Sequence, residues 1–153
     1  MAINSALFSS SKEDWETPQA MFDQLDAKYH FGFDLAASDS NHKCPRYFTK
    51  SDNALEQDWK TAGKGKPLFL NPPYSRHLRY WIEKAWLTSQ DYPAPIVVLI
   101  PARTDTSYWH DFIFGKAHIN FLRGRLKFER DGVAGDSAPF PSAIVTYNWE
   151  VEE

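Results

Sequence analysis

Apolar residues recur at helical spacing in three stretches of the chain. The first follows Thr17-Pro18, a pair typical of a helix start with Thr17 as N-cap and Pro18 as the first helical residue; its apolar positions are Met21, Phe22, Leu25 and Tyr29. A second helix is expected from about residue 76 to residue 90, with one face made of Leu78, Trp81, Ile82, Ala85 and Trp86. A third is expected at 107–114, ended by Gly115.

Short apolar runs between these helices predict strands at 31–35, 67–70 and 96–100. The run at 96–100 is β-branched, does not alternate with polar residues and is bounded by prolines, which indicates a central strand buried on both faces. Residues 47–49 are a further candidate strand and 53–58 a brief helical turn. Loops are expected at 39–46, around Gly63 and Gly65, and at 101–106.

The pattern changes after residue 116. Residues 117–122, 126–128 and 142–149 predict antiparallel strands, with a turn at 123–125 and a long loop before the last strand. Helices and strands alternate first and a hairpin follows, so the expected fold class is α/β: a mainly parallel sheet with a C-terminal antiparallel hairpin. Ligands bind beyond the carboxyl ends of the strands in such sheets. Asp34, Asn71 and the 101–106 loop should therefore line one crevice.

Composition adds bounds on the class of protein. The chain has 153 residues with 42% hydrophobic and 24% charged, which fits one globular domain at 13–153 after a flexible Ser- and Ala-rich tail at 1–12. No stretch reaches the roughly 18 apolar residues of a membrane span, and no secretory signal opens the chain. A single cysteine, Cys44, excludes an internal disulfide and fits a reducing compartment. A cytoplasmic location is expected.

Charge gives a local rather than a global indication. The net charge is −3, yet basic residues cluster near 60–66, 76–79 and 123–130. Such clusters are either solvated faces or a local nucleic-acid surface. Arg103, in the polar loop 101–106, either binds phosphate or belongs to a loop that satisfies its own polar groups. His42 and Cys44 have no second pair of ligands nearby, so no metal site is expected.

The most informative residues are Asn71-Pro72-Pro73-Tyr74, between the strand at 67–70 and the next helix. Two adjacent prolines fix two φ angles and remove two backbone donors, which makes a stiff turn with free carbonyl groups. The Asn71 side-chain oxygen and the Pro72 carbonyl can accept both N–H bonds of a planar amine such as that of adenine. They would stabilise the positive charge that develops when its nitrogen attacks a carbon electrophile. Tyr74 can stack on the base.

The site for a methyl donor is less distinct, because the chain has no GxGxxG loop. Asp34 and the small residues Ala36, Ala37 and Ser38 after the first strand would let a ligand approach the backbone, although a plain strand-to-loop transition explains them equally well. Asp52 and Asp58 stand on candidate loops. Each would either hydrogen-bond a ribose or an adenine amino group, or cap a turn.

The chain resembles the small phage- and prophage-type DNA N6-adenine methyltransferases of the Dam group. The matching stretches begin at Trp15 and end near Tyr147, and they include WETPQ (15–19), FDLAA (33–37), YFT (47–49), NPPYS (71–75), IPARTDT (100–106), GRLKF (124–128) and APFPS (138–142). The resemblance implies a compact Rossmann-like fold that uses S-adenosylmethionine to methylate N6 of a flipped-out adenine in double-stranded DNA. A bacterial cell, with a gene of phage origin, is the implied setting.

The resemblance also implies roles for individual residues. Catalysis would fall to Asn71, Pro72, Pro73 and Tyr74, and the donor would contact Trp15, Thr17, Pro18, Asp34, Ala36, Ala37, Ser38, Asp52 and Asp58. Because the chain has no room for a separate recognition domain, DNA contacts would rest on the loops with Arg76, Arg103, Arg123 and Arg125, in a monomer or a homodimer. RNA or protein amino groups as substrates, and a catalytically silent nucleic-acid-binding module, are the alternatives.

Overall fold

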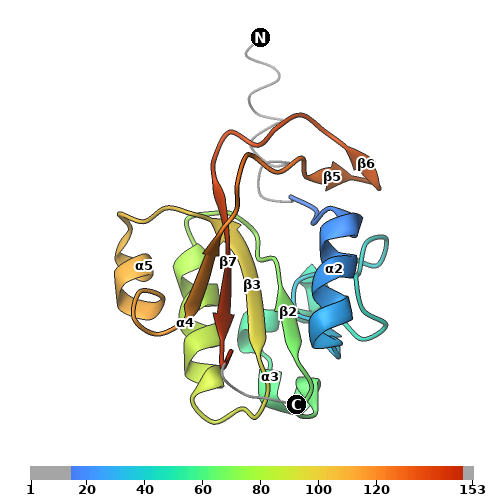
Figure 1. Ribbon diagram of the computed structural model, residues 1–153. Helices are drawn as coiled ribbons and strands as arrows, with labels where there is room; N and C mark the ends of the chain where they lie inside the picture. Colours follow the sequence, from blue (N-terminus) through green and yellow to red (C-terminus); the bar gives the residue numbers. More distant parts are fainter. Residues whose placement is uncertain (1–14, 150–153) are drawn as a thin grey trace.

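The computed structural model describes residues 15–149, so the tail predicted at 1–12 lies outside the described residues. Its main sheet has the spatial order β1-β2-β3-β7-β4 (Figure 1). The strands are β1 (Phe33–Asp34), β2 (Leu68–Leu70), β3 (Ile96–Pro101), β4 (His118–Phe121) and β7 (Ser142–Tyr147). A small second sheet pairs β5 (Glu129–Arg130) with β6 (Val133–Ala134).

The sheet combines parallel and antiparallel pairs. Strand β2 pairs in parallel with β1 and with β3, whereas β7 runs antiparallel to both of its neighbours, β3 and β4. Strand β4 therefore runs in the direction of β1, β2 and β3, and β7 alone runs against them. The prediction of an α/β fold with a mainly parallel sheet and an antiparallel C-terminal pair is confirmed at this level.

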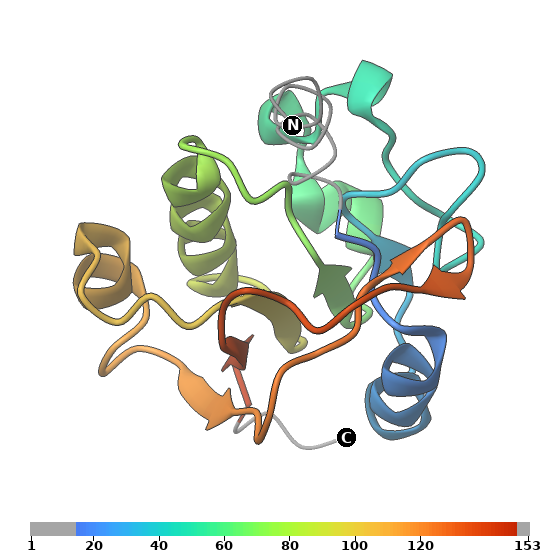
Figure 2. The ribbon, with the colours of Figure 1, turned by 90° about the horizontal axis from the view of Figure 1, so that it is seen from above.

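Helices cover both faces of the sheet. Helices α3 (Trp59–Gly63), α4 (Leu78–Ser89) and α5 (Ser107–Phe112) lie on one face, and α2 (Gln19–Tyr29) lies on the other (Figure 2). Two short 3-10 helices, η1 (Lys50–Asp52) and η2 (Ala54–Glu56), precede α3. No helix within residues 15–149 is long and apolar enough to cross a lipid bilayer.

Side-chain alternation along the strands fills two apolar cores. Leu68 and Leu70 pack on the α4 side, while Phe69 between them packs against Phe22 of α2. Strand β3 is buried on both faces, as its unbroken apolar run predicted. The core on the α2 side is completed by Phe128 and Phe140, which belong to a connection between β4 and β7, residues 122–141, called here the arm.

Several local predictions were wrong. The helix predicted to have Thr17 as N-cap begins at Gln19 with Pro18 as N-cap, because the buried Thr17 hydroxyl bonds to Asn71 instead. Residues 126–128 form no strand; the arm's strands β5 and β6 lie further on, across a turn whose residues Asp131 and Gly132 both have positive φ. Only an isolated bridge joins Tyr47 to Asp34 where a strand was predicted, and α3 was not predicted.

Candidate active site

Asn71 directly follows β2, at the carboxyl edge of the parallel strands. Its side-chain Nδ2 donates to the Trp15 carbonyl oxygen and to Thr17 Oγ1, the latter at 3.0 Å. Two acceptors on the nitrogen fix which way the amide faces. Its oxygen, Oδ1, is buried and has no hydrogen-bond partner among residues 15–149. A buried acceptor without a partner costs about 1–3 kcal/mol, so Oδ1 is a group held ready for a donor from outside.

The diproline turn leaves a second acceptor beside it. Pro72 is buried, and no hydrogen bond within the described residues ends on its carbonyl oxygen, whereas the Pro73 carbonyl accepts from Ser75 N at 3.1 Å. Neither proline offers a backbone N–H that would compete for an acceptor. The structure thus brings an unpaired amide oxygen and an unpaired backbone oxygen to consecutive residues.

Tyr74 is anchored in the core by its hydroxyl group, which donates to the Leu99 carbonyl oxygen at 2.9 Å. Burial raises the pKa of this phenol well above its usual value, so it stays neutral. Phe128 and Phe140 meet its ring edge-to-face, with centroids 6.0 and 5.7 Å away. Trp15 packs on the same two rings at 5.4 and 5.2 Å. These four rings are called here the aromatic cluster; they include Trp15, whose carbonyl oxygen accepts from Asn71, and Tyr74 of the same turn as Asn71.

Asp34 ends β1 and is only 3% exposed. Its carboxylate accepts from Ala36 N at 3.2 Å and from Lys43 N at 2.9 Å, which ties down the loop between them. Burial raises the pKa of Asp34, although those two backbone donors oppose the shift. Ala36, Ala37 and Ser38 lie at the surface of this loop and are half-buried or exposed. Contact of this segment with a donor stays a prediction.

Asp52 and Asp58 both act as caps. Asp52 Oδ2 accepts from Thr49 N at 2.7 Å and closes the start of η1, and Asp58 accepts from Lys60 N and Thr61 N at the start of α3. The bond from the Thr61 hydroxyl holds the pKa of Asp58 below its usual value. Both side chains are exposed and retain unused lone pairs, so a role in donor binding stays a prediction for each.

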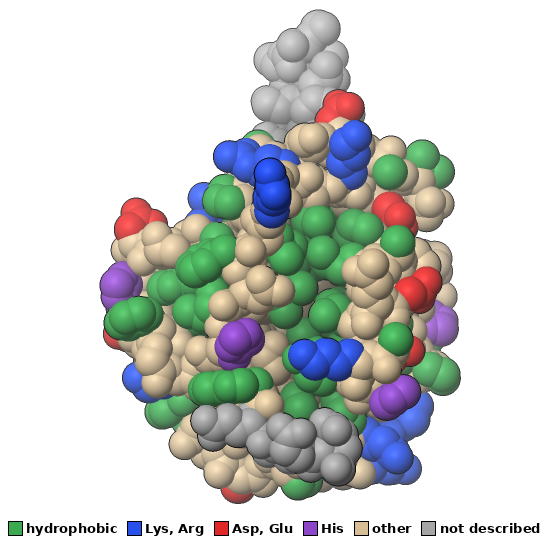
Figure 3. All heavy atoms as spheres, in the orientation of Figure 1, with side chains coloured by type: hydrophobic (Ala, Val, Ile, Leu, Met, Phe, Trp, Pro, Cys, Tyr) green, Lys and Arg blue, Asp and Glu red, His purple; other side chains and the backbone are tan. Residues whose placement is uncertain are grey.

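The predicted DNA contacts fall into two groups. Arg76 and Arg103 line a pocket of about 340 Å³ beside Tyr74. Arg123 and Arg125 lie on the arm, are exposed, and are followed by the exposed Lys127. Lys and Arg side chains stand at the upper end of the molecule in the space-filling view, where the arm lies in Figure 1 (Figure 3). Both groups thus lie on the side of the molecule that carries Asn71.

Sequence reasoning missed three residues of this region. Phe128 and Phe140 were treated as strand and loop positions, and Tyr108 as part of a helix, yet all three line or adjoin the site. The Asp131-Gly132 pair would have predicted the arm's hairpin, but no local pattern predicts which rings the arm carries to Asn71. Among residues 15–149, no three His, Cys, Asp or Glu side chains gather as a metal-binding group.

Comparisons with known proteins identify the family of the chain. Residues 4–147 match the family described as DNA N-6-adenine-methyltransferase (Dam). The chain is 30% identical over 119 residues to the "DNA N-6-adenine-methyltransferase" of Escherichia phage T1, which covers 77% of this chain and 48% of that protein. It is 37% identical over 65 residues to the "Putative methyltransferase YfdM" of Escherichia coli (strain K12), covering 40% of this chain and 71% of that protein.

The chain thus spans about half the length of the phage T1 protein. The family match covers most of this chain, and it includes the Trp15–Thr17 segment, the Asn71–Tyr74 turn and the whole arm. The chain therefore belongs to the DNA N-6-adenine-methyltransferase (Dam) family.

Proposed function

We propose that this protein transfers a methyl group from S-adenosylmethionine to N6 of adenine in double-stranded DNA. The observation that carries the proposal is Oδ1 of Asn71, which is buried and has no hydrogen-bond partner among residues 15–149. The amide is held by the two hydrogen bonds that its Nδ2 donates to Trp15 and Thr17, and it lies beside the Pro72 carbonyl. Family membership and the name of the phage T1 relative support the same activity.

Asn71 and Pro72 suit the chemistry of an aromatic amine. The exocyclic nitrogen of adenine is a poor nucleophile, because its lone pair is delocalised into the ring. When Asn71 Oδ1 and the Pro72 carbonyl accept its two N–H bonds, they favour a pyramidal nitrogen and stabilise the charge that develops on it. The amide is already oriented by Trp15 and Thr17, so no rearrangement is needed during the reaction.

The substrate base must leave the double helix to reach this position. Extruding a nucleotide costs a few kcal/mol, which contacts in the enzyme offset. Tyr74, within the aromatic cluster, offers a ring face for the extruded base, worth about 1–3 kcal/mol. We infer that Arg76, Arg103, Arg123 and Arg125 contribute to holding the surrounding DNA, since all four are at the surface near Asn71 or on the arm.

A second pocket suits the donor. It measures about 470 Å³ and is lined by Gln19, Ser40, Asn41, Lys43, Glu129, Asp131 and Gly132. Lys43 and two acidic residues provide both signs of charge, as the zwitterionic amino-acid end of S-adenosylmethionine requires. The pocket adjoins the predicted donor segments, because Gln19 follows Pro18 and Asn41 N bonds to the Ser38 carbonyl at 3.1 Å.

We infer that the Trp15–Pro18 and Ala36–Ser38 segments hold the donor, with Asp34 keeping the second segment in place. When bound, S-adenosylmethionine supplies an electrophilic methyl group on a sulfonium sulfur. Asp52 and Asp58 are proposed as further polar contacts. We also propose that the sheet is a compact Rossmann-like methyltransferase fold; helical connections between its parallel strands, and β7 inserted against their direction, support this.

A labelling experiment tests the proposed function. The purified protein is incubated with S-adenosylmethionine carrying a labelled methyl group and, separately, with double-stranded DNA, RNA or a protein extract. We expect label in DNA, recovered as N6-methyladenine after digestion to nucleosides. Label in RNA or in protein would assign the same site to another amine. Donor binding without transfer to any of the three would indicate a catalytically silent module.

The variant Asn71→Ala links the activity to the site. Removal of Oδ1 should abolish transfer, while the affinity for S-adenosylmethionine, measured by calorimetry, stays within a few fold of the original. Asn71→Ala also frees the Trp15 carbonyl and Thr17 hydroxyl, so its unfolding curve must accompany the assay. Equal loss of donor binding and transfer in a folded variant would place Asn71 in the donor site rather than at the amine.

A further inference from the structure

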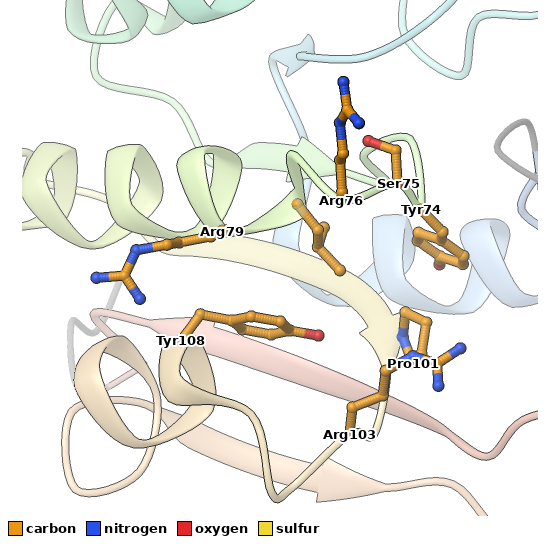
Figure 4. Close-up of a pocket in the computed structure, with 8 residues that line it drawn as sticks. Tyr74, Ser75, Arg76, Arg79, Pro101, Arg103 and Tyr108 are labelled. Carbon is orange, nitrogen blue, oxygen red and sulfur yellow. The ribbon is translucent and has the colours of Figure 1, made fainter.

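The pocket beside Tyr74 lies between the turn after β2, the start of α4, the end of β3 and the start of α5. Its lining residues are Tyr74, Ser75, Arg76, Leu78, Arg79, Pro101, Arg103 and Tyr108 (Figure 4). Its lining residue Tyr74 belongs to the same turn as Asn71, so an occupant of the pocket would lie next to that turn. No carboxylate lines it.

Tyr108 is the most informative residue of this pocket. It is 8% exposed, and its hydroxyl oxygen is buried without a hydrogen-bond partner among residues 15–149. The Thr106 hydroxyl lies near it, but directs its own proton to the Arg103 carbonyl oxygen at 2.8 Å. Figure 4 shows the Tyr108 hydroxyl pointing toward Pro101 and Arg103. Burial raises the pKa of Tyr108, so at neutral pH the group is an unused donor.

The charges around the pocket differ in their availability. Arg79 is committed to Asp111 at 3.3 Å and to the Ser107 hydroxyl at 3.1 Å. Arg76 and Arg103 are exposed and form no ion pair with any residue between 15 and 149. Arg103 is positioned over the Phe140 ring, 5.8 Å from its centroid, and so is attached to the aromatic cluster.

The rest of the pocket lining has a polar part and an apolar part. Ser75 Oγ accepts from His77 N at 3.1 Å and keeps its own proton for donation. Leu78 and Pro101 form an apolar surface next to these donors. A pocket with several donors, free cations and one apolar wall matches an oxygen-rich anion joined to a small apolar body, which in DNA is a phosphodiester with its deoxyribose.

We propose that this pocket receives the phosphodiester adjoining the target adenine, with the Tyr108 hydroxyl donating to a phosphate oxygen and Arg103 and Arg76 supplying the charge. The inference rests on the proposed function, because it assigns the neighbouring group of the same substrate. Holding that phosphate would keep the backbone in the rotated form that presents the base to Asn71. The contact carries no base information, so it would act on every DNA sequence.

Binding of a mixed-sequence duplex at several salt concentrations tests the pocket independently of methyl transfer. Tyr108→Phe should weaken binding about ten- to a hundredfold, the loss of one hydrogen bond to a charged group, without changing the salt slope. Arg103→Gln should weaken binding and reduce the slope of log K against log salt by about one. Tyr80→Phe, the same change at an exposed position of α4, is the control and should leave both quantities unchanged.

Stability separates a ligand-binding hydroxyl from a structural one. Because the Tyr108 hydroxyl is unpartnered, Tyr108→Phe should keep or raise the urea midpoint, whereas a hydroxyl needed for folding would lower it. A lowered midpoint would overturn the assignment. So would wild-type DNA binding by both Tyr108→Phe and Arg103→Gln.

A modified duplex locates the contact once a methylated adenine has been mapped. A neutral methylphosphonate replaces the phosphate on one or the other side of that adenine. At the phosphate that the pocket holds, the substitution should lower the affinity of the wild-type protein. The affinities of Tyr108→Phe and Arg103→Gln, already lowered by the mutation, should fall little further. Additive losses at both positions would overturn the inference even if DNA is methylated. Absence of methylation with the expected salt slopes would instead refute the proposed function alone.

Discussion

At the scale of single residues, the orientation of Asn71 depends on Thr17, 54 positions earlier in the chain. Thr17 is 2% exposed, and its hydroxyl accepts one of the two hydrogen bonds that fix the Asn71 amide. The substitution Thr17→Val keeps the shape of the side chain but removes this acceptor, so the Asn71 amide is less well aligned. We expect kcat to fall about tenfold, equivalent to one hydrogen bond, with the KM for DNA nearly unchanged.

Thr17→Ser restores the hydroxyl and should restore kcat, which a purely structural role of the Thr17 methyl group would not allow. Steady-state kinetics of the two variants, together with their unfolding curves, make the comparison. If Thr17→Val is folded and turns over like the wild type, Thr17 is not a positioning residue.

Tyr74 joins the core and the site through different atoms. Its hydroxyl caps the carbonyl of Leu99, one position beyond the last β2–β3 pair, Leu70–Val98, whereas its ring belongs to the aromatic cluster. Tyr74→Phe should therefore lower the unfolding free energy by about 1 kcal/mol and leave kcat within a few fold. Tyr74→Ala removes the ring face and should reduce kcat/KM by roughly ten- to a hundredfold. Similar kinetics for Phe and Ala would contradict a stacking role.

Some of these residues could be predicted from the sequence and others could not. Asn71, Pro72 and Tyr74 could be predicted together because they stand within four consecutive positions, and their role in catalysis stays a prediction. The bond from Asn71 to Thr17 could not, because Thr17-Pro18 also fits a helix start and nothing local indicates its distant partner. Tyr108 could not be predicted for a related reason, because within the helix Ser107–Phe112 its ring is like any other buried ring. Only the fold shows that its hydroxyl has no hydrogen-bond partner among residues 15–149.

At the scale of elements, predictions followed the strength of the local pattern. The continuous apolar run of β3 was located within one residue, because a strand covered on both faces needs no polar position. Helix α3, five residues long, is too short to show a period and is fixed by its Asp58 cap and the buried Trp59. Leu126 and Phe128 do face inward, and their carbonyl oxygens accept from Ala138 N at 2.8 Å and from Gly135 N at 2.9 Å. These two bonds do not form a regular ladder, so the segment is not a strand.

The loop after β1 offers a pH-dependent test at this scale. The pKa of Asp34 is raised by burial, so the native state binds its proton more tightly than the unfolded chain. The stability contributed by this proton is complete below the unfolded pKa of about 3.9 and is lost as pH rises through the native value. Unfolding free energy should therefore decrease with pH above about 4 in the wild type, and less steeply in Asp34→Asn.

Urea unfolding at a series of pH values checks this difference, with Asp136→Asn on the exposed arm as control. Asparagine has one oxygen for the two amides of Ala36 and Lys43, so one of these amides should also exchange hydrogen faster. If the unfolding free energies of the wild type and Asp34→Asn changed with pH in parallel, the buried carboxyl group would not be the cause of the pH dependence.

At the scale of the whole molecule, the arm connects the C-terminal strand pair to the opposite end of the chain. Glu129 N donates to the Glu16 carbonyl at 2.9 Å, and Phe128 packs against both Trp15 and Tyr74. The segment that orients Asn71 is thus held by the arm, and so is the ring beside the site. Because the arm also carries basic residues, DNA bound to it would act on the same elements that orient the Asn71 amide.

The arm's basic residues alternate with its apolar ones. Leu122, Leu126 and Phe128 are half-buried or buried, while Arg123, Arg125 and Lys127 are exposed, which is the pattern of an extended segment with one face on the protein. Arg125 also donates to the Ala138 carbonyl at 3.2 Å and so braces the arm. Arg123 has no such bond within residues 15–149, which leaves its guanidinium available to a phosphate.

Arg123→Gln should therefore weaken DNA binding and lower the slope of log K against log salt by about one, if the arginine neutralises one phosphate. Lys28→Gln removes the same charge in the last turn of α2, which runs away from the edge of the sheet that carries Asn71, and should leave the slope unchanged (Figure 1). Fluorescence anisotropy with a labelled duplex measures both. Equal slopes for all three proteins would place the arm outside the DNA interface, and recognition would then have to rest on the edge formed by Arg76 and Arg103.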